Sequence, residues 1–590
     1  MSSSTPATPP EPATPEATQP ESATPEPAAP EPARPGPRTS TAVDAFAEDY
    51  FERLLALAPE EATVLGRPGV ETEYADYSPA GREEVAQLQR ETLAQLAGMT
   101  PEDRIDAVTL HAMAERIGLD VALHESGRTE LNNLASAPQT VRMVLELMPA
   151  QSEQDFVHIA GRLHNLPAAL EGYWASLVNS AQAGQVPAQR QVHAVAEQCR
   201  SYALPEGALA GYALSGRQAQ VSSATQEALA AGTHAAQQAY LRLAERLESE
   251  LLPQAPAADA VGTEAYRLHS QFFTGTMLDL EETYRWGLEE LARLVAAQEV
   301  VAHQISPGAS VEEAKAILDA DPARQLSGTA ALQEWMQRLS DEALAALKDV
   351  HFDIPAPMDV LECMIAPTQD GGVYYTGPSD DFSRPGRMWW SVPEDDEHFT
   401  TWTETTTVYH EGVPGHHLQI ATATLVKDRL NSWRRHGSFV SGFAEGWALY
   451  AEQLMAELGF LADPGDLMGM YDMQRMRAAR VVFDIGVHCG FEAPPEWGGQ
   501  TWTPEQGKEF LRAHLPISSA QLDFEFTRYL GWPGQAPSYK VGQRVFEELR
   551  AECEAAAREA GEPFDLRAFH TELLGLGMIG LDTLRFAMRP

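Results

Sequence analysis

The sequence predicts a mainly α-helical protein with one small β element, and three observations support this class. Long stretches rich in Ala, Leu, Glu, Gln and Arg, all good helix formers, carry apolar residues at helical spacing. One region near residues 360–392 is instead rich in Pro, Gly and aromatic residues. No run of about 18 apolar residues is present, so no membrane-spanning helix is expected.

Helices are expected from the first folded residues, near Ala42, to the C-terminus. The first one carries Phe46, Tyr50 and Leu54 at helical spacing and stops before Pro59. Further helices are expected over 81–99, 104–126, 153–183, 224–252, 278–304 and within 311–349, and helices resume at about residue 402.

The β element is expected to contain two short strands, Leu361–Ile365 and Met388–Val392. Gly371 and Gly372 mark a turn between them. We expect this element to lie beside the functional site.

Three sections are expected along the 590 residues. Residues 1–40 repeat Pro, Thr, Glu and Ala with almost nothing to bury, which predicts a disordered tail. Residues 41–352 form a helical N-terminal half, and residues 353–590 form a catalytic half that carries the candidate metal site. A chain of this length exceeds a single core of about 250–300 residues, so more than one packed unit is expected.

The charge balance narrows the class of partner. The chain has 85 acidic and 42 basic residues, a formal net charge of −43, which argues against nucleic acid and anionic membranes as partners. The N-terminus lacks the basic and apolar segments of a signal peptide, so a cytoplasmic location is expected. The four cysteines include no C-x-x-C pair, so a cysteine zinc site is not expected. The sequence does not predict the oligomeric state.

The chemistry-bearing segment is YHEGVPGHHLQ, residues 409–419. A His-Glu pair on a helix is the first half of the metalloprotease motif H-E-x-x-H. In this motif the histidines bind zinc and the glutamate is the general base. Here His410 and Glu411 are followed by Pro414 and then by His416 and His417. The spacing therefore departs from the usual one, in which residues four apart share a helix face.

The proline accounts for this departure. In an unbroken helix His416 lies on another face than His410, and His417 lies about 10.5 Å further along the axis. Pro414 has no N–H, and its ring clashes with the carbonyl four residues back, so it breaks or kinks the helix. A kink could return His416 to the metal, and we prefer His416 as the second ligand. His417 stays an alternative, because spacing alone does not decide.

The third ligand is expected from another helix, SGFAEGWALYAEQL, residues 441–454. It carries Glu445 and Glu452 among apolar residues, and buried carboxylates need a cation or hydrogen-bond partner. Zinc supplies that partner for Glu445, and we expect a supporting role for Glu452. Two histidines and one glutamate leave an open position for water, as a catalytic zinc requires.

Several motifs together carry a resemblance to a known family. They are HEGVPGHHLQ, FAEGWALYAE, VVFDIGVH, RYLGWPGQAPSYKVG and the Arg-Pro-Gly segment at 384–386. Over residues 44–585 the chain resembles the bacterial DUF885 family, whose uncharacterised members are similar to gluzincin zinc metallopeptidases. The setting of Glu445 is also similar to the third-ligand helix of aminopeptidase-type gluzincins. The resemblance implies a long-helix body like that of angiotensin-converting enzyme, with a deep central groove.

Further site residues are expected on three other segments. His488 follows Asp484 by four residues and could donate a hydrogen bond to the transition state, while the alternative is an internal Asp–His bond. A tyrosine hydroxyl often stabilises the oxyanion beside zinc, which favours Tyr539. Substrate-binding candidates are Arg528 and Lys540, which could hold a carboxylate, and Tyr375 and Arg384, which could line the groove.

The preferred function is a zinc-dependent hydrolase of short peptides. One zinc ion per chain is held by His410, His416 and Glu445, and Glu411 takes the proton of the attacking water. Tyr539 or His488 stabilises the oxyanion. One alternative is an amidase or deacylase acting on a non-peptide amide. Another is a non-catalytic metal- or peptide-binding protein, whose metal is fully surrounded by protein ligands.

Overall fold

The structure is a computed structural model that describes residues 36, 38–367, 372–393 and 398–589. The described helices and strands all belong to one compact unit, Thr39–Pro590. The predicted disordered tail at 1–40 falls almost entirely outside the described residues. The division of the body at residues 352 and 353 stays a prediction.

The described part of this unit is mainly α-helical, as predicted. The helices before the β element are α1 (Ala42–Leu57), α2 (Pro59–Val64), α3 (Pro79–Leu96), α4 (Arg104–Glu125), α5 (Ala137–Glu146), α6 (Glu153–Gln182), α7 (Gln189–Tyr202), α8 (Ala210–Gln218), α9 (Ser223–Arg246), α10 (Thr263–Thr274), α11 (Leu280–Ile305), α12 (Val311–Asp319) and α13 (Thr329–Leu347). Those after it are α14 (Thr401–Glu411), α15 (His416–Leu425), α16 (Ser441–Glu457), α17 (Pro464–Cys489), α18 (Pro504–His514), α19 (Ser519–Gly531), α20 (Ser538–Ala560), α21 (Leu566–Leu574) and α22 (Leu581–Met588). None of the described helices is long and apolar enough to cross a bilayer.

The helical stretch expected within 311–349 is interrupted. Pro322 begins a 3-10 turn that Asp321 caps, and the short strand β1 (Gln325–Ser327) follows. Gly328, at φ +81°, then leads into α13. Proline lacks the N–H that a continuing helix needs, and a positive φ favours glycine, so these two residues explain the break.

Two small sheets make up the β element. Strands β2 (Leu361–Ile365) and β4 (Gly386–Trp390) pair in parallel, and β3 (Val373–Thr376) pairs antiparallel to β4. Strand β5 (His398–Thr400) pairs antiparallel with β1. The first expected strand has the predicted bounds. The second begins two residues before the predicted Met388, and Gly371 of the expected turn lies outside the described residues.

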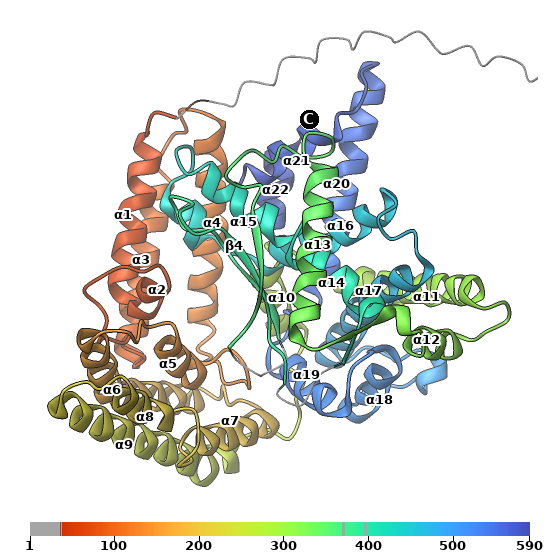
Figure 1. The fold of residues 1–590 in the computed structure, drawn as a ribbon. Coiled ribbons are helices and arrows are strands. Elements are labelled where there is room, and N and C mark those ends of the chain that lie inside the picture. The colour runs from red at the N-terminus through yellow and green to blue at the C-terminus, as the bar shows by residue number, and fades with distance from the viewer. Residues whose placement is uncertain (1–35, 37, 368–371, 394–397, 590) are drawn as a thin grey trace, which may run out of the picture. The chain divides into compact units, whose positions relative to one another are not determined.

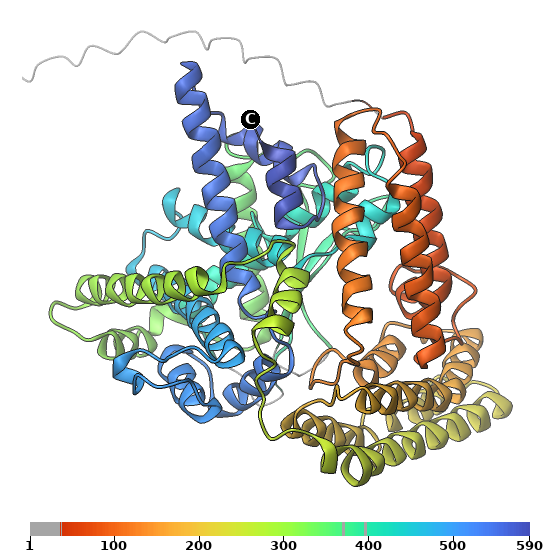
Figure 2. The same cartoon turned by 180° about the vertical axis from the view of Figure 1, so that it is seen from behind.

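Buried apolar residues gather in three main clusters. One is formed by helices α5 to α9, and a second by α10, α11 and α17 to α19. The largest joins α1, α4, α13, the β2–β4–β3 sheet, α14 to α16 and α20 to α22. In Figures 1 and 2, α1, α3 and α4 lie side by side, and α6 and α9 run together in a separate layer. The HEGVPGHH segment therefore sits in the largest core.

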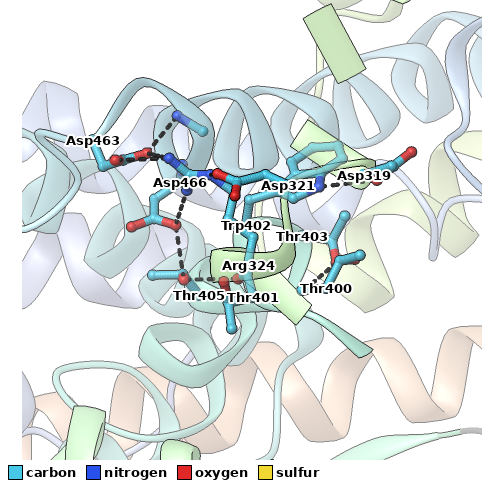
Figure 3. A network of polar contacts seen from close by, with 11 residues as sticks. Asp319, Asp321, Arg324, Thr400, Thr401, Trp402, Thr403, Thr405, Asp463 and Asp466 are labelled. Atoms are coloured by element: carbon cyan, nitrogen blue, oxygen red, sulfur yellow. Dashed lines mark hydrogen bonds and ion pairs between the residues drawn. The ribbon is translucent and has the colours of Figure 1, made fainter. Parts of the chain in front are cut away.

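Side-chain contacts fix the start of the helix that leads into that segment. At the start of α14, Trp402 Nε1 donates to Asp319 Oδ1 (3.0 Å) and Thr405 Oγ1 to Asp466 Oδ1 of α17 (3.2 Å). Arg324 pairs with Asp463 at 2.8 Å, as Figure 3 shows. This network ties the first turn of α14 to the first turn of α17.

Helices α16 and α20 approach each other through glycines. A Cβ atom on Gly446 would lie 2.5 Å from Gly542 Cα, and one on Gly542 would lie 2.0 Å from Gly442 O. Neither position has room for a side chain, so the two backbones touch. This contact brings Glu445, which precedes Gly446, close to the start of α20.

Candidate metal centre

The helix that begins with α14 is broken between Glu411 and His416. The Gly415 N–H donates to Tyr409 O at 3.0 Å, and a Cβ atom on Gly415 would lie 1.8 Å from His410 O. Only glycine fits at this position. Trp447 Nε1 of α16 donates to Pro414 O at 3.0 Å, which fastens the break to the next helix.

The break brings three side chains to one point. His410 Nε2 lies 3.4 Å from Glu445 Oε2, and His416 Nε2 lies 3.9 Å from the same oxygen. The two imidazole rings meet edge to face, with centroids 4.9 Å apart. One ligand atom from each of the three residues lies within 4.8 Å of the others. These three residues form what we call the metal cluster.

His417 points elsewhere. Its Nε2 donates to Met358 O at 2.8 Å, and its Nδ1 lies 3.0 Å from the hydroxyl of Tyr375. Both ring nitrogens are thus engaged by the β element and its flanking loop. Of the two adjacent histidines, the structure brings His416 to Glu445 and turns His417 away, and it places Tyr375 against His417.

Further polar groups hold His410 through its other ring nitrogen. Its Nδ1 lies 2.7 Å from Oε1 of Glu452, which follows Glu445 by about two turns of α16. Thr406 Oγ1 donates to Glu452 Oε2 at 3.0 Å, and Gln474 Nε2 of α17 donates to the same oxygen at 3.3 Å. A carboxylate on one ring nitrogen orients the other toward a metal, the usual partnership at histidine ligands.

The charges of the cluster are strongly coupled. Burial opposes ionisation of His410, but its contacts with Glu445 and Glu452 raise the pKa of this histidine to about 10. Burial also opposes ionisation of Glu445, but His410 and His416 lower the pKa of this carboxylate to about 2. Burial and the charge of His410 lower the pKa of His416 to about 4. An anionic carboxylate therefore faces a cation here.

The donor set fits a zinc ion. Four tetrahedral ligands at zinc bond lengths of about 2.0–2.2 Å lie about 3.3–3.6 Å apart. The separations of 3.4 and 3.9 Å between Glu445 Oε2 and the two histidine nitrogens are close to this. The side chains of His416 and Glu445 stay 13% and 21% exposed, so solvent reaches the open side of the cluster.

Glu411 lies at the end of α14, directly beside the cluster, and is 9% exposed. Burial, followed by the opposing charge of His410 and the repulsion of Glu445, leaves the pKa of Glu411 raised to about 7. No hydrogen-bond partner holds its carboxylate among the residues that the structure describes. It is therefore available to a ligand.

Tyr539, in the first turn of α20, adjoins the cluster. It is partly exposed, and its ring faces Arg477 Cζ at 5.9 Å and Arg480 Cζ at 5.3 Å. Burial and the nearby Glu445 carboxylate raise the pKa of Tyr539 to about 12. Its hydroxyl thus keeps its proton across the physiological range.

Three other predicted side chains already have protein partners. Lys540 pairs with Glu290 at 2.9 Å and donates to Gln474. Arg384 donates to the carbonyl of Gly377 at 2.7 Å, within its own loop. Arg528 is buried and pairs with Glu525 at 2.7 Å.

His488 lies on α17, 1% exposed, between α10 and α19. Its Nε2 donates to Tyr529 O at 3.1 Å, and its ring stacks on Tyr266. Asp484 Oδ1 is 3.9 Å away. None of these partners belongs to the metal cluster.

Two functional candidates beside the cluster, Arg477 and Arg480, were not predicted from the sequence. They lie on α17, three and six residues after Gln474, in the segment QRMRAARVV. The available signal is a pair of arginines three residues apart among apolar neighbours. This signal is weak, because such residues usually face solvent.

The sequence matches the profile of a family described as "Bacterial protein of unknown function (DUF885)" over residues 59–588. The chain belongs to the DUF885 family. No curated protein matches it significantly.

Two solved structures show the same fold. One is a "putative lipoprotein" from Colwellia psychrerythraea, 21% identical, with a TM-score of 0.79, covering 92% of this chain and 98% of that one. The other is a "putative lipoprotein of unknown function" from Shewanella oneidensis, 15% identical, with a TM-score of 0.70, covering 93% of this chain and all of that one. At these identities the likeness concerns the fold alone.

Proposed function

We propose that this DUF885 protein is a zinc-dependent hydrolase that cleaves peptide bonds, with short peptides as substrates. The observation that carries the proposal is the convergence of His410, His416 and Glu445 at zinc-ligand spacing, with one side open to solvent. This donor set is that of catalytic zinc sites with two histidines and one glutamate. The similarity to gluzincin metallopeptidases is part of the proposal.

The roles of the side chains follow from their surroundings. A bound zinc ion supplies Lewis acidity, which lowers the pKa of a water molecule and polarises a carbonyl oxygen. Glu411 removes the proton from the attacking water and passes it to the leaving amine. A general base works best with a pKa near the operating pH, and the pKa of Glu411 is raised to about 7.

Tyr539 is the candidate oxyanion donor. Its hydroxyl stays protonated because its pKa is raised to about 12 by burial and by Glu445, and part of its side chain is exposed. A preorganised donor beside the developing negative charge is a large contributor to catalysis. His488, the other candidate, has its Nε2 engaged by Tyr529 O and is buried, which favours Tyr539.

Of the two alternatives, the first depends on the surroundings of His417 and the second on the substrate alone. A non-catalytic metal site would have its ligand positions filled by protein, with His417 as the nearest candidate. Since both nitrogens of His417 contact Met358 and Tyr375, an open position for water is favoured. An amidase or deacylase on a non-peptide amide would use the same chemistry and differs only in substrate.

The test combines zinc content with hydrolysis. Zinc content is measured by mass spectrometry after incubation with zinc. We expect about one zinc per chain in the native protein and in the Glu411→Gln and His417→Gln variants. We expect none in His416→Gln. Hydrolysis of a short-peptide library should fall by about 10²–10⁴-fold in Glu411→Gln, because the general base is lost.

Each arm has an outcome that contradicts the proposal. A native chain that takes up no zinc excludes the hydrolase. A zinc-loaded Glu411→Gln variant with full activity excludes Glu411 as the base. Cleavage of acylated amines without cleavage of peptides favours the amidase alternative.

The location is also a proposal. The strongly acidic composition supports a chain that avoids nucleic acid and anionic membranes, in the cytoplasm. The two structural neighbours are called lipoproteins, which makes a lipid-anchored location the alternative. Cell fractionation of the producing organism distinguishes the two.

A further inference from the structure

Three arginines lie buried near Tyr539, which adjoins the metal cluster. Arg477 and Arg480 come from α17 and Arg528 from α19, and they are 8%, 6% and 6% exposed. Arg480 and Arg528 both have Cζ atoms over the ring of Tyr529, at 5.2 and 4.8 Å. These three residues are called the arginine cluster.

The arginine cluster has fewer carboxylate partners than guanidinium groups. Glu525 accepts from Arg480 at 3.0 Å and from Arg528 at 2.7 Å, and it also accepts from the Tyr529 hydroxyl. Arg528 makes a further bond to Gln535 Oε1 at 2.7 Å. One carboxylate thus serves two guanidinium groups.

Arg477 is the arginine without an ion-pair partner. Its hydrogen bond is a long one, 3.4 Å from NH1 to the backbone oxygen of Met473, and its buried Nε has no partner. No carboxylate oxygen of the described residues lies within ion-pair distance of it. A buried charge without a partner is costly, and such groups in native proteins call for an explanation such as a ligand.

The position of Arg477 ties it to the metal cluster. Gln474, one turn earlier on α17, donates to Glu452, the carboxylate that holds His410. The charge of Arg477 also contributes to lowering the pKa of Glu445. Tyr539, which is partly exposed, has both Arg477 and Arg480 over its ring. The unpaired guanidinium therefore lies near both Glu445 of the metal cluster and the partly exposed Tyr539.

The geometry points to a subsite for a substrate carboxylate at the arginine cluster, with Arg477 as its principal donor. We propose that the substrates are short peptides whose free C-terminal carboxylate binds there, so that the bond cleaved lies near the C-terminus. Guanidinium groups bind carboxylates through two parallel hydrogen bonds, which fixes the orientation of the bound group. This inference rests on the proposed hydrolase function for the cleavage step, but the binding step stands by itself.

The basic side chains that the sequence predicted to bind substrate are less suited. Lys540 already pairs with Glu290, and Arg384 is held by loop carbonyls. Arg528 has a carboxylate and an amide as partners. Arg477 alone among these has donors that no acceptor of the described residues fully uses.

The experiment separates binding from cleavage. Three probes are used: N-acetyl-trialanine with a free carboxylate, the same peptide as its C-terminal amide, and an amide whose last residue is aspartate. Binding to the full-length, zinc-free protein is measured by calorimetry, and hydrolysis by the zinc-loaded protein is measured in parallel. The variant is Arg477→Gln.

The matched control is Arg475→Gln. Arg475 lies on the same helix, two residues away on the opposite face, and its donors are taken by His514, Gln298 and the carbonyl of Ala513. Both variants remove one positive charge from α17. Melting temperatures of both report on folding.

We expect the free carboxylate to bind about 10–100-fold more tightly than the amide, which is the effect of charge-assisted hydrogen bonds. Arg477→Gln should abolish this preference, while Arg475→Gln keeps it. Equal binding of acid and amide, or an unchanged preference in a folded Arg477→Gln, overturns the subsite. If the aspartyl amide binds tightly while the free acid binds weakly, the assignment of the subsite to the C-terminal carboxylate is overturned. Selective binding without any hydrolysis overturns the proposed function but not the subsite.

Discussion

Two histidine–carboxylate pairs lie deep in this protein, and they behave in opposite ways. At the metal cluster, His410 has carboxylate oxygens at 2.7 Å and 3.4 Å, and its pKa is raised to about 10. On α17, His488 has the Asp484 oxygen at 3.9 Å, and burial lowers the pKa of this histidine to about 4. Burial likewise raises the pKa of Asp484 to about 7.

The difference shows what decides charge in an apolar interior. Burial disfavours the ionised form at both places, and only close contacts reverse it. Two carboxylates within hydrogen-bond reach are enough for His410. At His488 the nearest acceptor is a backbone carbonyl, so the neutral ring is preferred. The first pair is suited to hold a cation and the second is suited to packing.

The largest effect is expected on zinc binding, which we would compare in two matched histidine variants. We expect His410→Gln to lose zinc, with affinity falling by more than about 100-fold, because loss of a ligand exceeds the 10–100-fold cost of losing a group that supports one. His488→Gln should keep about one zinc per chain. Metal content after dialysis against a weak chelator is the measurement.

His488→Gln serves here as the control for removing a buried histidine from this half of the chain. Its amide can still donate to Tyr529 O, so the expected change is confined to stability. Loss of zinc in a folded His488→Gln variant would contradict the distinction between the two pairs.

A smaller effect is expected from the carboxylate that supports His410. Glu452→Gln keeps an acceptor for His410 Nδ1 but removes the charge, so zinc affinity should fall about 10–100-fold. Competition with a chelator of known affinity measures this. Glu457→Gln, an exposed residue on the same helix that pairs with Arg550, should leave the affinity unchanged. Equal affinities for both variants would mean that Glu452 does not support the ligand.

The smallest effect concerns the second pair. The folded-state pKa of Asp484 is about 7, above its unfolded value of 3.8, so the folded state holds the proton more tightly. Stability from this group is therefore present at low pH and is lost as pH rises toward 7, by at most about 1.4 kcal/mol per pH unit. Asp484→Asn imitates the protonated side chain, and we expect it to gain stability relative to the native chain between pH 5 and pH 7.

Denaturant unfolding of both proteins at the two pH values measures this gain. Asp523→Asn is the control, because Asp523 is exposed, pairs with Lys508, and has its pKa lowered by that contact. A gain in Asp523→Asn equal to that in Asp484→Asn would refer the effect to net charge and not to burial.

The mainly α class was predictable because helix propensity and apolar periodicity extend over long stretches. Strand β2 was also placed correctly, from a short apolar run after the Pro-rich segment. The interruption was missed. Pro322 and Gly328 break the helix locally, but strand β1 between them depends on its pairing with β5, far away in the sequence. Long-range strand pairing has no local signal.

The metal cluster was proposed from residue types, and its geometry depends on features that the sequence only suggests. Pro414 predicted a break, but the direction of the chain after it depends on Trp447 and on the close approach of Gly415 to the carbonyl of His410. The spacing of His488 from Asp484 also favoured a functional pair, although it carries no information about burial or about competing acceptors. The arginine cluster could not be predicted, because Arg480 of α17 meets Glu525 and Tyr529 of α19 only in the folded structure.

The glycine contact between α16 and α20 also limits how this protein can diverge. Because Gly446 and Gly542 touch through their backbones, no substitution at either position can change the distance between the two helices in small steps. The distance from Glu445 to the first turn of α20 is thus a fixed quantity in any relative that keeps both glycines. Evolution of a new substrate preference would then proceed through exchange of side chains on α17, α19 and α20, while the frame that holds them stays constant.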